Sequence, residues 1–187
     1  LPAELHEEML RYGLGHREAL EPSSTGGLRR RENWRRSHVD RAPPFGERVL
    51  PVICRVAEQA VERLGLEPFE MISRDIQFTA HNDGDYYRVH RDWTPEDTGH
   101  RRLTFVYYLH RQPLGFDGGG LRMFDTSEDG GQYFDQAYSK VLPRDNRIVF
   151  FPSYVWHEVE KVTCRSGLYE DSRFTLNGWL GVADERR

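Results

Sequence analysis

Three residues of this sequence have the types and spacing to form a metal site. His90 and Asp92 stand one residue apart, and His157 follows much later in the segment WHEV. Two imidazoles and one carboxylate can bind one face of an octahedral ion and leave its other positions open, which suits oxygen chemistry at non-haem Fe(II). The His-x-Asp pair alone is weak support for a metal site, because such pairs are usually surface ion pairs. The metal-site hypothesis therefore has to be tested against the rest of the chain.

A second polar pattern occupies the apolar segment 173–182 near the end of the chain. Strand alternation places Arg173, Thr175, Asn177 and Trp179 on one face and apolar residues on the other. An arginine and a threonine on one face of such a strand are costly to bury unless an anion meets them. Because a guanidinium pairs with a carboxylate through two parallel hydrogen bonds, the pattern predicts a site for a small dicarboxylate that also reaches the metal.

The elements that must position these residues are two helices and a long series of strands. Apolar residues recur at helical spacing in residues 2–13 and 46–64, and Pro51 fits the second helix only in its first turn. Seven later segments have strand patterns and are separated by turn sequences: 71–81, 86–90, 103–110, 121–125, 147–152, 155–162 and 173–182. We therefore expect an α+β, mainly β fold, a double-stranded β-helix (jelly roll) with supporting N-terminal helices.

Residues 21–44 show no clear periodicity and contain a strongly basic run at 29–36. One interpretation is a solvated loop. The other is a mobile lid in which Trp34 and the arginines cover an acidic or peptide substrate.

The length of 187 residues predicts one domain, with helices and a possible lid loop in 1–70 and the jelly-roll core in 71–182. A net charge of −4 does not indicate a nucleic-acid partner, and no apolar run is long enough for a membrane span. The two cysteines, Cys54 in a helical pattern and Cys164 in a polar loop, do not indicate a disulfide framework. A cytoplasmic protein with a peptide, protein or amino-acid-like substrate is the expectation.

Six segments taken together resemble the Fe(II)/2-oxoglutarate oxygenases of the prolyl 4-hydroxylase type. They are YRVHRD at 87–92, LTFVYYL at 103–109, GGLRMF at 119–124, RIVFFP at 147–152, WHEV at 156–159 and RFTLNGW at 173–179. The resemblance covers residues 71–182, and the combination is far more specific than any single segment.

The resemblance implies that His90, Asp92 and His157 bind Fe(II). It also implies an enzyme, a 2-oxoglutarate-dependent dioxygenase that uses O2, hydroxylates an unactivated C–H and releases succinate and CO2. The substrate would be a prolyl residue in a peptide or protein, or an amino acid derivative. Related halogenases lack the carboxylate, so Asp92 favours hydroxylation.

The resemblance also assigns the cosubstrate pocket. Arg173 would bind the distal carboxylate of 2-oxoglutarate, with Tyr108 and Thr175 as further hydrogen-bonding partners. Leu121 would line this pocket, and Trp179 would flank the iron site.

One position departs from the family pattern. Where family members usually carry a tyrosine shortly before the first iron-binding histidine, this sequence has His81. His81 is therefore either a replacement donor to the cosubstrate or a hydrogen-bonded structural histidine.

Two readings from other functional classes remain open. The chain could be a non-catalytic jelly-roll protein that binds a metal or a ligand. It could also be a zinc-dependent, cupin-like isomerase or hydrolase, although Arg173, Thr175 and Tyr108 would then lack a shared purpose.

Overall fold

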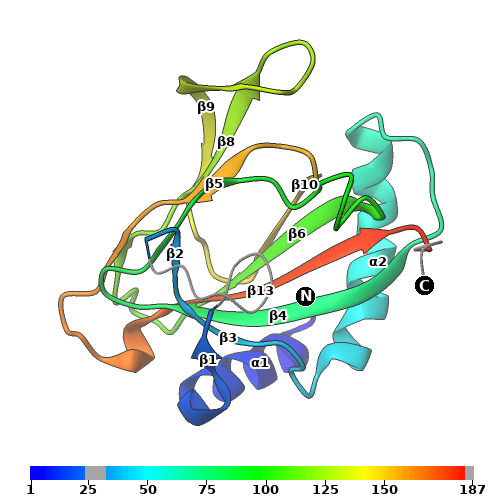
Figure 1. Ribbon diagram of the computed structural model, residues 1–187. Coiled ribbons are helices and arrows are strands. Elements are labelled where there is room, and N and C mark those ends of the chain that lie inside the picture. The colour runs from blue at the N-terminus through cyan, green and yellow to red at the C-terminus, as the bar shows by residue number, and fades with distance from the viewer. Residues whose placement is uncertain (24–32, 184–187) are drawn as a thin grey trace.

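The computed structural model describes residues 1–23 and 33–183, and it shows two antiparallel sheets with two helices behind the larger one (Figure 1). The six-stranded sheet has the order β1 (Glu21–Pro22), β3 (His38–Asp40), β4 (Ile72–His81), β13 (Arg173–Gly181), β6 (Arg101–Leu109) and β10 (Arg147–Pro152). The five-stranded sheet has the order β2 (Arg35–Arg36), β5 (Tyr86–His90), β11 (His157–Val159), β8 (Leu121–Thr126) and β9 (Tyr133–Val141). The predicted mainly β fold with N-terminal helices is confirmed.

The remaining elements are short connections and the two helices. A small ladder pairs β12 (Val162–Thr163) with β7 (Asp117–Gly118). The helices are α1 (Ala3–Gly15) and α2 (Gly46–Arg63), and two 3₁₀ turns span Arg17–Ala19 and Tyr169–Asp171.

The main core lies between the helices and the outer face of the six-stranded sheet. Helix α2 buries Val49, Ile53, Ala57 and Val61, which recur every four residues and form one stripe along the helix. The sheet contributes fully buried side chains from its three central strands: Phe78, Leu103, Phe105, Tyr107, Leu109, Phe174, Leu176 and Leu180. Burial of this face fixes which residues of the same strands point inward, toward the second sheet.

Pro51 contradicts the expectation that it must lie in the first turn of its helix. It is the sixth residue of α2, and the helix continues beyond it to Arg63. Proline has no N–H to bond the carbonyl of Glu47, but both residues are exposed, so water can satisfy that carbonyl. Helix α2 tolerates the proline because the buried stripe on its other face holds it to the sheet.

Replacing Phe105 with alanine should lower the free energy of unfolding by about 3–5 kcal/mol. Phe105 is fully buried, and its ring lies over Gly178, where a Cβ atom would be only 2.5 Å from Cζ of the phenylalanine. Urea unfolding measures the change. Phe134→Ala, at a side chain that is 49% exposed, is the matched control and should change stability far less. Equal losses in the two variants would contradict this packing.

The inner face of the six-stranded sheet is polar along strand β13. In the ladder with β4, Arg173 lies opposite His81, and in the ladder with β6, Thr175 lies opposite Tyr108. Directly paired residues point to the same face of a sheet. The register therefore brings these four side chains together at the N-terminal end of β13.

Several sequence predictions differ from the structure. Strand β9 was not predicted, and the predicted strand at 155–162 is divided into β11 and β12. The segment at 21–44, expected to lack strands, contains β1, β2 and β3, while its residues 24–32, including the first part of the basic run, lie outside the described residues. Cys164, expected in a polar loop, is buried at 2% exposure in a small cluster with Phe116 and Val162.

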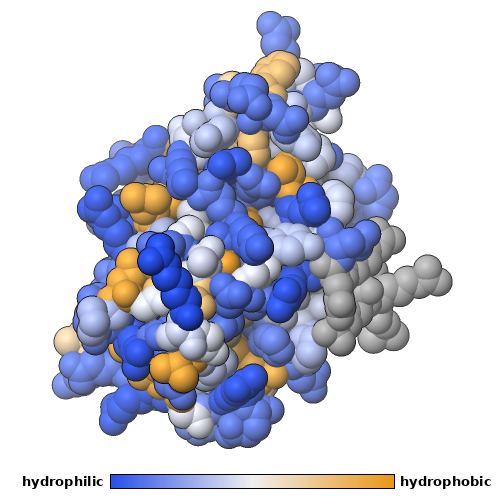
Figure 2. Space-filling model, turned by 90° about the vertical axis from the view of Figure 1, so that its left-hand side faces the viewer, coloured by the Kyte–Doolittle hydropathy of each residue, from blue (hydrophilic) through white to orange (hydrophobic). Residues whose placement is uncertain are grey.

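The surface is largely hydrophilic on the face that Figure 2 shows, and its apolar residues are scattered in small groups. Such scattering is normal for exposed apolar side chains and marks no extended apolar patch on this face. Within the described residues, no helix has both the length and the apolar character needed to cross a membrane.

Candidate functional site

His90 and His157 lie opposite each other on neighbouring strands of the five-stranded sheet, β5 and β11. The next pair in this ladder is Tyr87 with Val159, so β5 has one more residue than β11 between the two pairs. This bulge lets Tyr87 and His90 both face the interior, although strict alternation would send them to opposite faces. The Tyr87 ring then stacks on the His90 ring, with 3.6 Å between centroids.

Backbone carbonyls fix both imidazoles in the same orientation. Nδ1 of His90 lies 2.8 Å from the carbonyl oxygen of Arg88, and Nδ1 of His157 lies 2.8 Å from that of Val155. A carbonyl oxygen only accepts hydrogen bonds, so Nδ1 carries the proton in each ring and Nε2 keeps its lone pair. Both lone pairs are thereby available to a metal.

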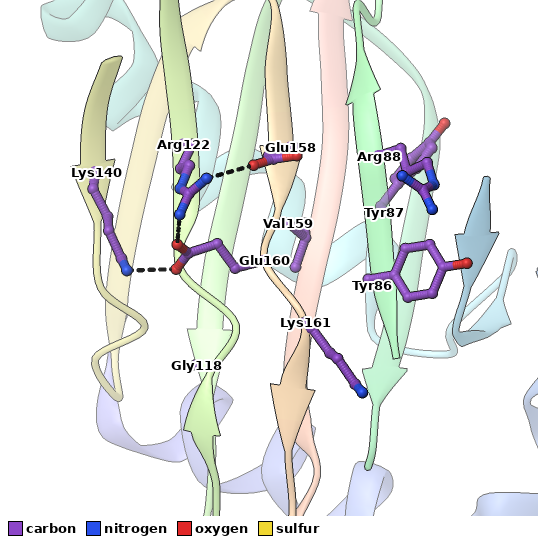
Figure 3. Close-up of a pocket in the computed structure, with 10 residues that line it drawn as sticks. All are labelled: Tyr86, Tyr87, Arg88, Gly118, Arg122, Lys140, Glu158, Val159, Glu160 and Lys161. Carbon is purple, nitrogen blue, oxygen red and sulfur yellow. Dashed lines mark hydrogen bonds and ion pairs between the residues drawn. The ribbon is translucent and has the colours of Figure 1, made fainter. Parts of the chain in front are cut away.

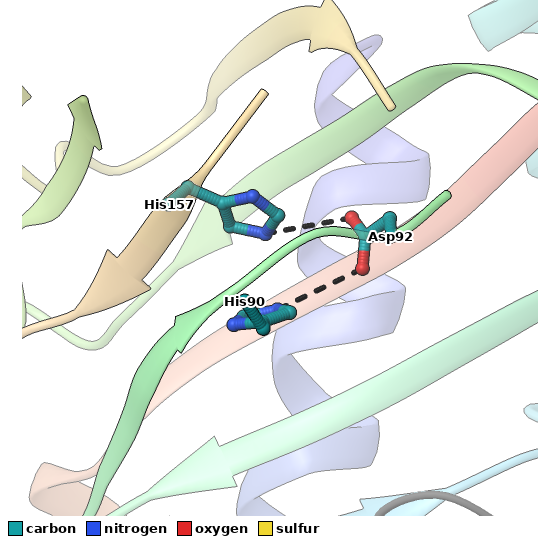
Figure 4. Close-up of side chains that lie close together, drawn as sticks. All are labelled: His90, Asp92 and His157. Atoms are coloured by element: carbon teal, nitrogen blue, oxygen red, sulfur yellow. Dashed lines mark ion pairs between the residues drawn. The ribbon is translucent and has the colours of Figure 1, made fainter. Parts of the chain in front are cut away.

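Asp92 completes the cluster from the loop after β5 (Figure 4). Its Oδ1 is 3.7 Å from Nε2 of His90, and its Oδ2 is 3.5 Å from Nε2 of His157. Adjacent ligands of an octahedral ion stand roughly 3 Å apart when the bonds are about 2.1 Å. The three side chains fit a small divalent ion after slight adjustment, and they form the single group of this kind within the described residues.

Thr104 holds the carboxylate of Asp92 in place. The Thr104 hydroxyl donates to Oδ2 of Asp92 at 2.9 Å and lies 3.0 Å from the hydroxyl of Ser153. The backbone N–H of Asp92 donates to the carbonyl of Ser153 at 3.1 Å. Hydrogen bonds of this kind orient a carboxylate toward a metal and limit its rotation.

The electrostatics of the cluster also suit a cation. Burial lowers the pKa of His90 to about 3, with a further contribution from His157, so the ring is neutral at pH 7. Burial alone would raise the pKa of Asp92, but His157 and His90 outweigh it and leave the pKa below its usual value. The neutral His90 imidazole beside an ionised carboxylate suits the binding of a divalent metal.

Arg173 lies in the same cavity as the cluster. It is 1% exposed, its Nε donates to the carbonyl of Gly119 at 2.8 Å, and one terminal nitrogen has no hydrogen-bond partner among residues 1–23 and 33–183. A Cβ atom at Gly119 would lie 2.6 Å from Cδ of Arg173, and Gly119 has a φ of +64° that favours glycine. A buried guanidinium without a carboxylate partner in the described part of the chain calls for an anionic ligand.

Three more side chains around Arg173 have buried polar atoms for which the described part of the chain offers no hydrogen-bond partner. These atoms are the Tyr108 hydroxyl, the Thr175 hydroxyl and both ring nitrogens of His81. Burial, followed by the charge of Arg173, holds the pKa of His81 well below its usual value, so its neutral ring has one donor and one acceptor. Among the described residues, neither ring nitrogen of His81 has a hydrogen-bond partner, which favours a donor role over a structural one.

The structure places the other predicted site residues in the same cavity. Leu121 and Trp179 line it together with the two histidines and Arg173. Thr104 and Gly119 were missed as partners of Asp92 and Arg173, because both contacts arise only when distant strands meet. Arg35 also lines this cavity, and the sequence predicted it only as part of the basic run.

A larger hollow of about 620 Å³ lies beside this cavity, along β5, β8, β9 and β11 (Figure 3). Four of its charged residues form ion pairs, among them Arg122 with Glu158 at 3.2 Å and Lys140 with Glu160 at 2.6 Å, while Arg88 and Lys161 also line the hollow. The smaller cavity holds the metal cluster and the unpartnered polar atoms, so it is the stronger candidate site.

The fold and these two features define a class of protein. Two facing antiparallel sheets that enclose a two-histidine, one-carboxylate cluster and a buried arginine are the arrangement of a jelly-roll protein built for non-haem iron. The sequence model of the 2OG-Fe(II) oxygenase superfamily matches residues 76–181 of the chain. The chain belongs to this superfamily, whose members use Fe(II), 2-oxoglutarate and O2.

Individual relatives agree with this membership. An uncharacterised PKHD-type hydroxylase of Synechocystis sp. is 33% identical over 184 residues, which is 96% of this chain and 60% of that protein. The chain thus spans 60% of the length of this relative.

Solved structures with the same fold include two prolyl hydroxylases. A Pseudomonas putida prolyl-4-hydroxylase is 26% identical with a TM-score of 0.67, covering 98% of this chain and 89% of that chain. A Trichoplax adhaerens prolyl hydroxylase in complex with a hypoxia inducible factor peptide is 16% identical with a TM-score of 0.68, covering 97% and 80%. The second likeness concerns the fold alone.

Proposed function

We propose that this chain is a hydroxylase in which His90, Asp92 and His157 bind Fe(II) and Arg173 binds 2-oxoglutarate. The substrate is a prolyl residue in a peptide or protein, or an amino acid derivative, and the co-products are succinate and CO2. The superfamily membership and the likeness to the P. putida prolyl-4-hydroxylase support this proposal.

The observation that carries the proposal is the set of unpartnered polar atoms beside the metal cluster. The guanidinium of Arg173 and the hydroxyls of Tyr108 and Thr175 are buried with free hydrogen-bonding capacity. A dicarboxylate that meets these groups at one end and the metal at the other satisfies all of them. A site that only held a metal would not need the buried arginine.

Each residue has a distinct task in this proposal. The bound iron and 2-oxoglutarate supply the oxidising chemistry. The charge of Arg173 fixes the distal carboxylate of 2-oxoglutarate, while hydrogen bonds from Tyr108 and Thr175 orient that carboxylate. Neutral His81 adds one donor at the same end, in place of the tyrosine common in the family. The walls formed by Leu121 and Trp179 restrict the space and exclude water from the cluster.

The decisive experiment measures succinate formation from 2-oxoglutarate by the purified chain with Fe(II) and O2. Succinate should form with Fe(II) and should not form when a chelator removes the metal or when Zn²⁺ replaces it. Failure to form succinate with Fe(II), together with tight binding of Zn²⁺, would favour a zinc enzyme instead. Tight binding of Fe(II) and 2-oxoglutarate without any succinate, in the presence of peptides and amino acids, would favour the non-catalytic binding protein.

Replacing Thr104 with valine should weaken Fe(II) binding by about 10- to 100-fold. The valine keeps the shape of the side chain but removes the hydrogen bond that orients Oδ2 of Asp92. Anaerobic titration with Fe(II) measures the affinity. Thr126→Val, at an exposed position on β8, serves as the control and should bind Fe(II) like the wild type. An unchanged affinity in Thr104→Val would show that Asp92 needs no such support.

A further inference from the structure

A second arginine lines the metal cavity, and it enters from the opposite sheet. Arg35 lies on β2 opposite Tyr87 of β5, so both side chains point to the interior. The next residue, Arg36, points to the other face and pairs with Asp85 at 3.0 Å. The two neighbouring arginines therefore have different surroundings, and Arg35 is the one directed toward the metal cluster.

The side chain of Arg35 is largely buried, and it has no carboxylate partner among the described residues. Arg35 is 9% exposed, and its Nε donates to the Ser37 hydroxyl at 3.0 Å. Its guanidinium carbon lies 4.8 Å from the centre of the Tyr87 ring. Within residues 1–23 and 33–183, no Asp or Glu lies within ion-pair distance of Arg35, and no acceptor is bonded to its terminal nitrogens.

Other arginines around the core have carboxylate partners. Arg101 pairs with Asp75 at 3.3 Å, and Arg111 pairs with Asp171 at 2.5 Å. Arg173 lacks such a partner, and it is the residue to which the cosubstrate is assigned. A buried, unpaired arginine is costly for stability, which makes an anionic ligand the simplest reason for its presence in a cavity.

The cosubstrate does not account for Arg35. The polar groups assigned to the distal carboxylate of 2-oxoglutarate come from the six-stranded sheet: His81 on β4, Tyr108 on β6, and Arg173 with Thr175 on β13. Arg35 comes from the five-stranded sheet and contacts Tyr87, whose ring stacks on His90. Under the proposed function, the two carboxylates of 2-oxoglutarate are already bound by Arg173 and the metal. A further carboxylate must come from another molecule.

We propose that Arg35 binds a carboxylate of the primary substrate, so that the substrate is a carboxylic acid whose acid group lies close to the C–H that reacts. This inference rests on the proposed function. Arg35 supplies two parallel N–H donors, Ser37 fixes its Nε, and the Tyr87 ring supports its flat face. The acid is either a free amino acid or similar small acid, or the terminal or side-chain carboxylate of a peptide.

Matched acids and amides test the proposal. The probes are the free protein amino acids against their amides, and N-acetylated peptides ending in a free proline against the same peptides ending in prolinamide. Mass spectrometry detects the gain of one oxygen. The wild type should favour the acid over the amide by about 10- to 100-fold in kcat/KM, the value of a charge-assisted pair. Activity on free amino acids alone indicates a small acid, and activity on peptides alone indicates a peptide carboxylate.

Variants assign this preference to Arg35. In Arg35→Met, which keeps the apolar stem over Tyr87, the acid preference should disappear, and Arg35→Lys should restore part of it. Arg165→Met makes the same charge change at a side chain that is 86% exposed and should keep the preference. Equal activity of the wild type on acids and amides, or an acid preference that survives in Arg35→Met, would overturn the proposal.

Two measurements without turnover separate this inference from the proposed function. Anaerobic calorimetry should give Arg35→Met the same affinity for 2-oxoglutarate as the wild type, and a loss as large as in Arg173→Met would place Arg35 in the cosubstrate site instead. The melting temperature of Arg35→Met should equal or exceed that of the wild type, because the variant removes an unpaired buried charge. A clearly lower melting temperature would make Arg35 a structural residue. Absence of Fe(II) and 2-oxoglutarate binding in the wild type would instead refute the proposed function.

Discussion

Arg173→Met should raise the dissociation constant for 2-oxoglutarate by about two to three orders of magnitude, with a corresponding loss of succinate formation. Removing one partner of a buried, hydrogen-bonded charge pair costs roughly 2–5 kcal/mol. Arg173 is 1% exposed and has no carboxylate partner in the described chain, so the ligand is its natural partner. Methionine keeps most of the side-chain volume and avoids a cavity.

Anaerobic calorimetry with Fe(II) present measures this change directly. Arg173→Lys should be intermediate, because lysine keeps the charge but cannot offer two parallel N–H donors. Arg165→Met, at a side chain that is 86% exposed, is the matched control and should bind 2-oxoglutarate like the wild type. If Arg173→Met kept wild-type affinity while remaining folded, the arginine would be structural, and the cosubstrate would have to bind elsewhere.

The parts of the site that the sequence predicted lie on strands such as β13, whose two faces are both buried but differ in polarity. In β13, the polar Arg173 and Thr175 alternate with the buried Phe174 and Leu176, and the structure keeps this alternation. Strand β10 spans Arg147–Pro152, the same residues as predicted. Such strands can be predicted because the alternation of polar and apolar residues is visible in the local sequence.

Strand β9 could not be predicted in this way because it is largely exposed on both faces. Its residues Tyr133–Val141 include Phe134, which is 49% exposed, and Tyr138, which is 40% exposed. Hydrogen bonds between the backbones of β8 and β9 hold the strand at the edge of its sheet. Backbone hydrogen bonds do not require a pattern of apolar residues, so the sequence does not reveal this strand. The short strands β1, β2 and β3 were not predicted, because a segment of two or three residues is too short to show the alternation of polar and apolar residues.

The contacts that shape the site depend on the register between paired strands, which the pattern of residues within one strand does not determine. A bulge in β5 brings Tyr87 and His90 to the same face, although alternation along the strand predicts opposite faces. Arg35 becomes part of the cavity only because β2 pairs with β5 at Tyr87. In the sequence, Arg35 and Arg36 are equivalent members of one basic run, and only the pairing distinguishes them.

Asp92→Asn should abolish the stabilisation of the protein by Fe(II) and reduce succinate formation by roughly 1,000-fold or more. Asparagine keeps the shape of the side chain and can still accept the hydrogen bond from Thr104, but it removes the one negative charge of the cluster. Two imidazoles with an amide then face a dication, and carboxylate is the harder and more strongly binding ligand.

Wild-type protein should melt at a higher temperature with Fe(II) than without it, because only the folded chain presents the assembled cluster. Asp92→Asn should lose that difference while its metal-free melting temperature stays close to that of the wild type. Asp135→Asn, at an exposed carboxylate of β9, makes the same change away from the cluster and should keep the full effect of Fe(II). If Asp92→Asn retained the Fe(II)-dependent rise, the metal would not depend on this carboxylate, and the three-residue site would be wrong.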